Sequence, residues 1–473
     1  MDTKKLRQKI LDLAIRGKLV PQNPNDEPAS VLLERIRAEK EQLIKEGKIK
    51  RSKKSVASDT SHYENVPFEV PESWCWVKVA DISSVIAYGV SESAKSEGKF
   101  KLLRISDIQD NVVNWNTVPY TDYPESKSEN YILQAGDILF ARTGATVGKS
   151  YIVDETVPKN AIYASYLIKV RVSDMISPRY VKYFFESGFY WEQIANNSVG
   201  VGQPNVNGGS LGNLWVPIPP IREQRRIVDK LESWCLIIDK ISVNQELMTK
   251  QVGELRSHIL DLALSGKLVP QETCDEPAKE LLKRINPIFS PTDNRHYANV
   301  PETWEVVALK DVTEIITGST PSKSVPAYYS GDVPFYKPND LDQGRHVRTA
   351  SEHLSQQGKE ISRSIPSNSI AVCCIGSIGK CGYIEHEGVT NQQINTIIPN
   401  EAIFPLYLFY FCNSTSFIDK LKSQSSAVTI PIVNKSKLST IQIPLPPISE
   451  QKRIVNAIET ILHKLDIIVG EIL

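Results

Sequence analysis

The sequence predicts two mixed α/β domains, long antiparallel coiled-coil helices that join them, and a circular pseudo-two-fold repeat. Three observations lead to this fold class. Two segments of the chain each occur twice, one linker carries apolar residues at heptad spacing, and two regions alternate short β-branched and aromatic runs with turn residues. The 473 residues would accommodate about two to four domains of roughly 100–200 residues each.

The first repeated segment lies near the start of the chain. Residues 6–22, LRQKILDLAIRGKLVPQ, recur at 255–271 with 13 of 17 positions identical. The tetrapeptide DEPA at 26–29 recurs at 275–278 with the same offset of 249 residues. Internal similarity of this length indicates a duplicated structural unit.

A second repeat has a different offset. VPIPPIREQRRIV at 216–228 returns as IPLPPISEQKRIV at 443–455, with 9 of 13 positions identical and an offset of 227 residues. Because the two offsets differ, the C-terminal segment followed by the N-terminal segment reproduces the central segment 207–271. The chain therefore reads as a ring of two copies, opened inside one of its two helical linkers.

The central linker is expected to be one long helix. Its apolar residues run from Ile227 to Leu262 in alternating steps of four and three, which is the spacing of a coiled-coil seam. The proline pair at 219–220 can precede such a helix, and Gly266 suits its end. About 44 residues would give a rod of roughly 65 Å. Pseudo-two-fold symmetry requires an antiparallel pairing of this helix with the helices at the two ends of the chain.

Shorter helices are expected at 29–46 and at about 277–285, after each copy of the first repeat. Each domain should also carry one later helix, around 177–194 and around 404–421. The basic stretch at 48–54 reads as a solvated connector, with a phosphate-contacting arm as the alternative.

These expectations divide the chain into five parts. They are an N-terminal helical repeat and linker (1–65), a first domain (66–215), a central long helix or spacer (216–296), a second domain (297–442), and a C-terminal helix that pairs with the central helix (443–473).

Composition excludes several classes of protein. The 55 basic residues balance the 55 acidic ones, so the strong positive charge of many DNA-binding domains is missing. No apolar run approaches the roughly 18 residues needed to span a membrane. The first residues read as an amphipathic helix rather than a secretory signal. Seven scattered cysteines are typical of reduced thiols in a cytoplasmic protein.

The glycine-rich stretch at 144–150 is one residue too short for a nucleotide-binding phosphate loop, and its second copy is shorter still. We expect a tight turn between strands, with DNA-phosphate contact by Lys149 and Lys380 as the alternative. Cysteines 373, 374 and 381 lack the spacing and the histidines of a metal site, so we expect buried thiols and no bound metal. No catalytic motif stands out.

Duplicated polar positions are more informative. Arg104, Ser106 and Asp107 match Lys337, Asn339 and Asp340. Such residues suit recognition of base edges, whereas a turn capped by the aspartate is the structural alternative. Further amide-rich segments lie at 203–207 and 391–395. The complete set of candidate DNA-binding residues is Arg104, Ser106, Asp107, Arg142, Lys149, Gln203, Asn205, Lys337, Asn339, Asp340, Lys380, Asn391, Gln392 and Gln393. Asn207 and Asn434 suit turns or helix caps.

Three features together resemble one protein family. They are the repeated LDLA-x-x-GKLVPQ segment, the P-x-PP-I-x-EQ-x-RIV start of a long helix, and the P-E-[ST]-W opening of each domain at 71–74 and 301–304. The sequence is similar to the specificity (S) subunit of type I restriction–modification enzymes over essentially its whole length. The helix-start motifs are specific, whereas the domain interiors match only in outline.

The resemblance implies a non-catalytic subunit with two target-recognition domains, each reading one half of an asymmetric, interrupted site in double-stranded DNA. The long helices would space the domains and, with them, dock two methyltransferase (M) subunits, which restriction (R) subunits would join. S-adenosylmethionine, ATP and Mg²⁺ would belong to these partners, and no cofactor to this chain. By motif position, the residues expected at the helix starts and the partner-docking scaffold are Pro219, Pro220, Glu223, Gln224, Pro446, Pro447, Glu450 and Gln451.

Two other classes of protein stay compatible with the residues: a coiled-coil scaffold that presents two non-DNA-binding domains, and a lone regulatory DNA-binding protein. Residues 72–215 carry 13 basic and 15 acidic side chains, and residues 302–442 carry 12 and 13. Because neutralisation of phosphates supplies most non-specific affinity for DNA, we expect the isolated chain to bind DNA weakly and to depend on its partners.

Overall fold

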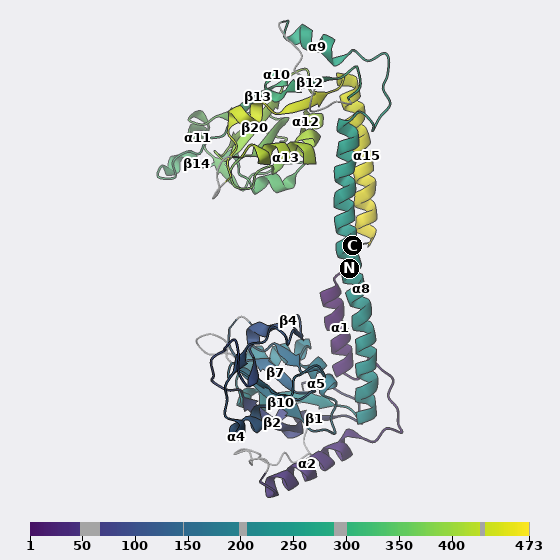
Figure 1. The fold of residues 1–473 in the computed structure, drawn as a ribbon. Coiled ribbons are helices and arrows are strands. Elements are labelled where there is room, and N and C mark those ends of the chain that lie inside the picture. Colours follow the sequence, from purple (N-terminus) through teal and green to yellow (C-terminus); the bar gives the residue numbers. More distant parts are fainter. Residues whose placement is uncertain (48–66, 145, 198–205, 288–299, 426–430, 473) are drawn as a thin grey trace. The chain divides into compact units, whose positions relative to one another are not determined.

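The computed structural model describes residues 1–47, 67–144, 146–197, 206–287, 300–425 and 431–472. The chain forms two compact units, Met1–Asn244 (unit 1) and Gln245–Leu473 (unit 2). The long helix α8 (Ile221–Leu264) contributes its first half to unit 1 and its second half to unit 2. Within each unit, a mixed α/β domain packs beside a pair of helices (Figure 1).

Unit 1 begins with a helical segment, continues into the first domain and ends in α8. Its elements in chain order are α1 (Thr3–Ile15), α2 (Ala29–Lys45), β1 (Cys75–Lys78), α3 (Val79–Ile82), β2 (Ser83–Tyr88), β3 (Phe100–Leu103), η1 (Ile105–Asp107), β4 (Ile108–Gln109), β5 (Val112–Val113), β6 (Tyr120–Thr121), α4 (Glu125–Ser128), η2 (Glu129–Tyr131), β7 (Ile138–Ala141), β8 (Ser150–Ile152), β9 (Ala161–Tyr163), β10 (Leu167–Val172), α5 (Pro178–Phe184), α6 (Gly188–Asn197), α7 (Gly208–Gly212), β11 (Trp215–Ile218) and the first half of α8.

Unit 2 repeats most of this order after the second half of α8. Its further elements are α9 (Ala278–Ile285), β12 (Glu305–Ala308), α10 (Leu309–Val312), β13 (Thr313–Thr317), η3 (Pro326–Tyr328), β14 (Tyr329–Tyr336), η4 (Asp340–Gln343), β15 (Glu352–Leu354), α11 (Gln356–Glu360), β16 (Ser364–Ile365), β17 (Ser369–Cys373), β18 (Cys381–Ile384), β19 (Gly388–Thr390), β20 (Ile394–Pro399), α12 (Pro405–Cys412), α13 (Thr415–Ser423), α14 (Lys435–Ser439), β21 (Gln442–Leu445) and α15 (Ile448–Ile472).

The two domains share a sheet topology that the sequence left open. A four-stranded antiparallel sheet has the order β2-β10-β7-β8 in unit 1 and β13-β20-β17-β18 in unit 2. A two-stranded pair, β1 with β11 and β12 with β21, joins the beginning of each domain to its end, directly before the long helix. The second sheets differ, because β6-β3-β9 has three strands and β15-β14-β19-β16 has four.

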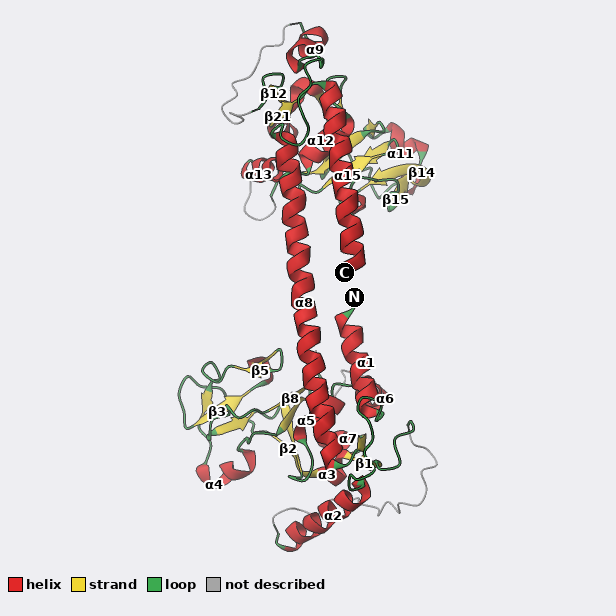
Figure 2. Cartoon of the chain, turned by 90° about the vertical axis from the view of Figure 1, so that its right-hand side faces the viewer, coloured by secondary structure: helices red, strands yellow, loops and turns green. Residues whose placement is uncertain are grey.

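The helix pairs are antiparallel and equivalent in the two units. In unit 1, Arg7 on α1 bonds to Asp239 on α8 at 2.6 Å. In unit 2, Arg256 on α8 forms an ion pair with Asp466 on α15. The two ion pairs occupy corresponding positions of the repeats. Helix α1 therefore pairs with the first half of α8 in the same way as the second half of α8 pairs with α15 (Figure 2). This arrangement confirms the predicted antiparallel helices and circular repeat.

Helix α8 begins and ends where the sequence predicted. It starts directly after Pro219-Pro220, and Gly266 adopts a positive φ of 70° two residues beyond its end. A Cβ atom at Gly266 would lie 2.4 Å from the Pro301 side chain, so only glycine fits this turn. The predicted seam is mostly buried or half-buried, although Leu255 is 45% exposed.

One expectation about the domains was wrong. The segments 177–194 and 404–421 each form two helices instead of one: α5 and α6 in unit 1, and α12 and α13 in unit 2. Each break has a physical cause, because a buried serine hydroxyl accepts the N–H of the second helix: Tyr190 N to Ser187 Oγ at 3.3 Å, and Phe417 N to Ser414 Oγ at 3.2 Å. A serine that caps a helix in this way ends the preceding one.

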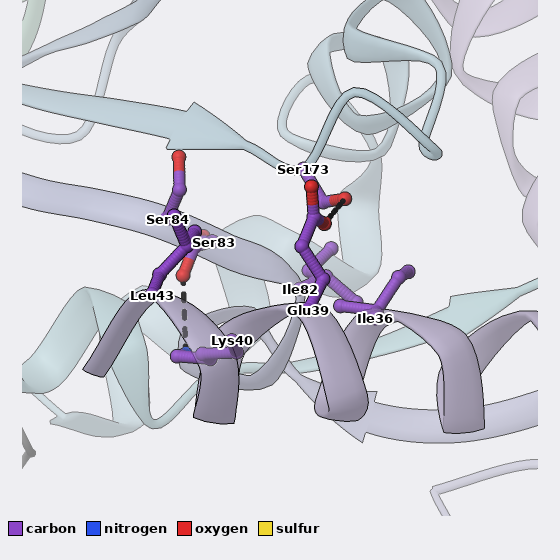
Figure 3. A pocket seen from close by; sticks show the side chains of 8 residues that line it. All are labelled: Ile36, Glu39, Lys40, Leu43, Ile82, Ser83, Ser84 and Ser173. Carbon is purple, nitrogen blue, oxygen red and sulfur yellow. Dashed lines mark hydrogen bonds between the residues drawn. The ribbon is translucent and has the colours of Figure 1, made fainter. Parts of the chain in front are cut away.

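Helix α2 packs on the first domain around a small hollow (Figure 3). Lys40 Nζ donates to the carbonyl oxygens of Ala80 at 2.5 Å and Ser83 at 3.1 Å, and Ser173 Oγ donates to Glu39 at 3.1 Å. Since its polar groups bond to one another, this hollow anchors α2 to the domain. Helix α9 in unit 2 has 8 residues against the 17 of α2.

Candidate functional site

A buried hydrogen-bond network surrounds the start of α8 in unit 1. The Glu223 carboxylate, 1% exposed, accepts hydrogen bonds from Trp74 Nε1 at 3.0 Å and from Gln22 Nε2 at 2.6 Å. Gln224 is fully buried, accepts from Ser177 N at 2.9 Å and donates to Pro219 O at 2.9 Å. We call this set of contacts the helix-start network. It ties the first repeat, the domain and the long helix together.

Unit 2 carries the same helix-start network around α15. Glu450 accepts from Trp304 Nε1 at 2.9 Å and from Gln271 Nε2 at 2.5 Å. Gln451 accepts from Phe404 N at 2.7 Å and donates to Pro446 O at 2.9 Å, as well as to Ala402 O at 3.1 Å. Each of the four hydrogen bonds of the first unit thus has a counterpart at the corresponding position of the second.

Charged groups complete the network at its solvent edge. Arg226 bonds to Asp26 at 2.6 Å in unit 1, and Arg453 bonds to Asp275 at 2.6 Å in unit 2. Burial raises the pKa of the Glu223 and Glu450 carboxyls above the usual value, and their hydrogen bonds and the nearby arginines act against that shift. These glutamates serve as acceptors for structure, because each faces an indole and an amide.

The helix-start residues therefore form a scaffold. Pro219, Pro220, Pro446 and Pro447 are also buried, so none of the eight predicted residues offers an exposed side chain. A docking partner would have to use their neighbours. Sequence reasoning missed the tryptophan, glutamine and aspartate partners, although all of them lie inside the repeated PE[ST]W, GKLVPQ and DEPA segments. Repetition in both copies was the signal that could have found them.

The paired candidates at 104–107 and 337–340 form capped turns. Asp107 accepts the backbone N–H of Arg104 at 2.9 Å, and Asp340 accepts that of Lys337 at 2.7 Å. The Arg104 guanidinium also donates two hydrogen bonds, of 3.0 and 2.7 Å, to the Asp107 carboxylate. In unit 2, Lys337 forms an ion pair with Glu352. The structural alternative is thus observed, while base contact by these residues and by Ser106 and Asn339 stays a prediction.

The other candidates lie around the ends of the large sheets. Arg142 follows β7, and its guanidinium carbon lies 4.9 Å from the centroid of the Tyr88 ring. Asn391 is buried and donates to Gln393 Oε1 at 3.0 Å, while the exposed Gln392 accepts a bond from Thr320. Gln203 and Asn205 lie outside the described residues, as does the basic stretch at 48–54.

Comparison with known protein families places this architecture. The family model of the type I restriction modification DNA specificity domain matches residues 71–247 and again residues 301–472. The two matches correspond to the two domains with their following helices, and together they cover most of the chain. The chain belongs to this family.

Curated relatives agree with this assignment. The specificity subunit of the Type I restriction enzyme EcoAI from Escherichia coli is 27% identical over 97% of this chain and 89% of its own length. The EcoEI specificity subunit from Escherichia coli is 25% identical over 98% of this chain and 89% of the relative. This chain is a type I specificity subunit.

Solved structures share the fold. A chain from a structure that addresses complex assembly and conformational transition of a type I R-M system has a TM-score of 0.63 and 19% identity, over 86% of this chain and 94% of that chain. The HsdS subunit from Thermoanaerobacter tengcongensis has a TM-score of 0.51 and 18% identity, over 86% of this chain and 92% of that chain. Among the described residues of this specificity subunit, no helix is long and apolar enough to cross a membrane.

Strands β7 and β8, like β17 and β18, are antiparallel neighbours. The described residues of both glycine-rich stretches (142–144 and 146–149, and 374–380) lie in the tight turns between them, as predicted. Lys149 is exposed, and Lys380 pairs with Asp342 at 2.7 Å.

Cys373, Cys374 and Cys381 are buried free thiols, and burial raises the pKa of Cys374 to about 11. Asn207 and Asn434 cap α7 and α14, also as predicted.

Proposed function

We propose that this specificity subunit reads a bipartite, asymmetric site in double-stranded DNA, with one half-site for each domain. The observation that carries the proposal is the contrast between the two units: the helix-start network is the same in both, whereas the domain interiors differ. Two equal frames that present unequal surfaces suit two unequal half-sites. Pseudo-two-fold symmetry would present the half-sites in opposite orientations, as it does for dimeric DNA-binding proteins.

We further propose that α8 sets the gap between the half-sites. Its 44 residues correspond to about 66 Å of helix. Seven residues inserted between Asn244 and Gln245 would lie outside two contacts of the helix pairs: Ser242 Oγ to Thr3 Oγ1 at 2.9 Å in unit 1, and the Arg256–Asp466 ion pair in unit 2.

The insertion would add about 10 Å of helix, equivalent to about three base pairs. We expect the methylated sites of a cell that carries the variant to keep both half-sites and to gain a longer gap. An insertion of the same seven residues into the exposed turn at Gly47 is the control and should leave the gap unchanged. Altered half-sites at an unchanged gap would refute the proposal that α8 sets the gap.

The subunit would act with two methyltransferase subunits and with restriction subunits, which bind S-adenosylmethionine, ATP and Mg²⁺. Exposed apolar side chains on the long helices support docking there. They are Leu236, Ile237 and Val243 in unit 1, and Leu247, Leu255, Ile467 and Ile468 in unit 2, with exposed fractions between 45% and 64%. Contiguous exposed apolar residues, such as the neighbours Leu236 and Ile237 or Ile467 and Ile468, are typical of surfaces that a partner covers.

The neutral chain is proposed to bind DNA weakly by itself and to gain its affinity from the methyltransferase subunits. Titration of a labelled duplex that carries the target site, at one fixed salt concentration, should show tight specific binding only with the partners present. The target comes from methylome sequencing with and without this chain. Methylation that depends on the chain supports the specificity role, and an unchanged methylome would favour a scaffold of non-DNA-binding domains.

A further inference from the structure

The ends of three strands in each domain form a cluster whose backbone is the same in both units. We call it the strand-end cluster: residues 88, 142, 166 and 168 in unit 1, and residues 317, 374, 393 and 395 in unit 2. Residue 88 is paired with residue 168 across β2 and β10, and residue 317 is paired with residue 395 across β13 and β20.

Backbone hydrogen bonds establish the remaining correspondences. Arg142 N donates to Tyr166 O at 3.0 Å, and Cys374 N donates to Gln393 O at 2.8 Å. The carbonyl oxygens of Arg142 and Cys374 accept equivalent hydrogen bonds. The donor is Val206 N at 3.2 Å in unit 1 and Val433 N at 2.9 Å in unit 2. The side chains of the cluster thus leave the same frame at the same points.

In unit 1 the cluster is cationic and aromatic. The Arg142 guanidinium lies over the Tyr88 ring, and no acceptor among the described residues lies within hydrogen-bonding distance of its buried Nε. Gly208 N donates to the Tyr88 hydroxyl at 2.9 Å, which fixes the ring. Tyr166 is 62% exposed beside them. Arg142 is therefore held by stacking, whereas Arg104 is occupied by the Asp107 carboxylate.

In unit 2 the same positions carry two amides, one hydroxyl and one thiol. Thr317 Oγ1 donates to Asn395 Oδ1 at 2.7 Å, and the half-buried Gln393 accepts the bond from Asn391. Cys374, at the position of Arg142, is buried. The change from an arginine with two tyrosines to a set of amides is the kind of difference that changes which base edge a surface can bind, because arginine matches guanine O6 and N7, while asparagine and glutamine match adenine N6 and N7.

We propose that the strand-end cluster determines base specificity in both domains: Arg142 recognises a guanine in one half-site, and Gln393 recognises an adenine in the other. Stacking on Tyr88 pre-orients the guanidinium, and Asn391 pre-orients the amide, so little conformational freedom is lost on binding. This inference rests on the proposed function, because it assigns residues to the two half-sites.

The test compares three arginine variants of the full chain, each expressed with its methyltransferase subunits and read out by methylome sequencing. Arg142→Ala should reduce the preference for guanine at one position of one half-site by about 10- to 100-fold. Arg142→Lys keeps the charge but loses the two-pronged geometry, and should relax the same position while total methylation is retained. Arg179→Ala, which removes an arginine of the same domain that pairs with Glu232 and is not a candidate DNA-binding residue, is the matched control and should leave the recognised sequence unchanged.

Gln393→Ala gives the reciprocal result in unit 2, a relaxed adenine position in the other half-site with the first half-site intact. An unchanged target with Arg142→Lys, or relaxation of the same position by the control Arg179→Ala, would overturn the inference while the bipartite function stands. If Arg142→Ala yields no methylation, Arg142→Lys and co-purification with the methyltransferase separate misfolding from lost recognition. A wild-type methylome that does not depend on this chain would instead refute the proposed function.

Discussion

The helix-start network and the strand-end cluster are both present twice, and they differ in what the second copy preserves. Around Glu223 and Glu450 the same types of donor bond to the same acceptor. The hydrogen-bond lengths are 3.0 and 2.6 Å in unit 1 and 2.9 and 2.5 Å in unit 2. At the strand ends the backbone bonds recur, but Arg142 is replaced by Cys374. One region repeats its side chains and the other repeats only its backbone.

Burial explains this difference. Gln224 and Gln451 are completely buried, and removal of one partner from a buried hydrogen bond leaves a desolvated group unpaired. Tyr88 and Tyr166 are 40% and 62% exposed, so substitution there costs little stability. A frame that repeats its backbone hydrogen bonds and varies the side chains at the strand ends can acquire a new recognition surface without losing its fold.

The largest expected effect removes one glutamine from each network. Gln451→Ala would leave the Phe404 N–H and two carbonyl groups unpaired, which should destabilise unit 2 by about 3–5 kcal/mol. Gln224→Ala would leave the Ser177 N–H and only one carbonyl group, that of Pro219, unpaired. It should destabilise unit 1 by about 2–4 kcal/mol. Hydrogen exchange, followed separately in peptides of each unit, measures both. The exposed neighbour Lys452 provides the control, and Lys452→Ala should change stability by less than about 0.5 kcal/mol.

A buried lysine distinguishes the two domains by its pH dependence. Lys169 is 1% exposed, donates to the carbonyl oxygens of Asn130 and Ile132, and occupies the position of Thr396 in unit 2. Burial lowers its pKa to about 8 from the ordinary 10.5. Between these values the unfolded chain binds more protons than the folded chain, so the free energy of unfolding of unit 1 rises with pH.

The loss of the Lys169 proton should increase the free energy of unfolding of unit 1 by about 2 kcal/mol between pH 7.5 and 9.5. Buried tyrosines act in the opposite direction near pH 10, because burial raises the pKa of groups such as Tyr151, to about 12. The relevant quantity is therefore the difference between the wild type and Lys169→Met, which retains those tyrosines. The difference should be confined to unit 1, and equal pH slopes in the two proteins would contradict the assignment of a charged, buried Lys169.

The smallest effect concerns the equivalent ion pairs of the helices. Arg7→Ala and Arg256→Ala each remove one exposed pair, with Asp239 and Asp466 respectively. Exposed pairs contribute about 0.2–1 kcal/mol, so both losses should be small and similar, and smaller still at high salt. A loss above about 2 kcal/mol from only one of them would indicate that the helix pairs are not equivalent.

The sequence predicted those parts of the fold that repetition and heptad spacing encode. The bounds of α8 and the glycine at its end follow from local residue patterns, the antiparallel pairing follows from the two-fold repeat, and the structure confirms all three. The breaks at Ser187 and Ser414 were missed because a run of apolar residues conceals a serine cap. Strand order could not be predicted, because it depends on long-range pairing such as that of β10 with β2.

For the site, sequence identified residues but not their partners. Glu223 and Gln224 were recognised as a repeated motif, but the indole of Trp74, 149 positions away, was not connected with them. Arg104 and Arg142 were equal candidates in the sequence. Only the structure shows that Asp107 occupies the first, whereas a tyrosine ring stacks on the second.

The most direct test of the central claim exchanges one domain. Residues 75–218 of unit 1, bounded by the β1–β11 pair, would be replaced by residues 305–445 of unit 2, bounded by β12–β21. Gln22, Trp74, Glu223 and Gln224 would stay in place, and the N–H of Phe404 would replace that of Ser177 as the donor to Gln224. Methylome sequencing of cells that express this chimaera with the methyltransferase subunits gives its target. If equal frames present the two half-sites in opposite orientations, the methylated site will become palindromic, with the half-site of unit 2 on both sides. A methylated site that keeps the original unit 1 half-site would contradict the claim.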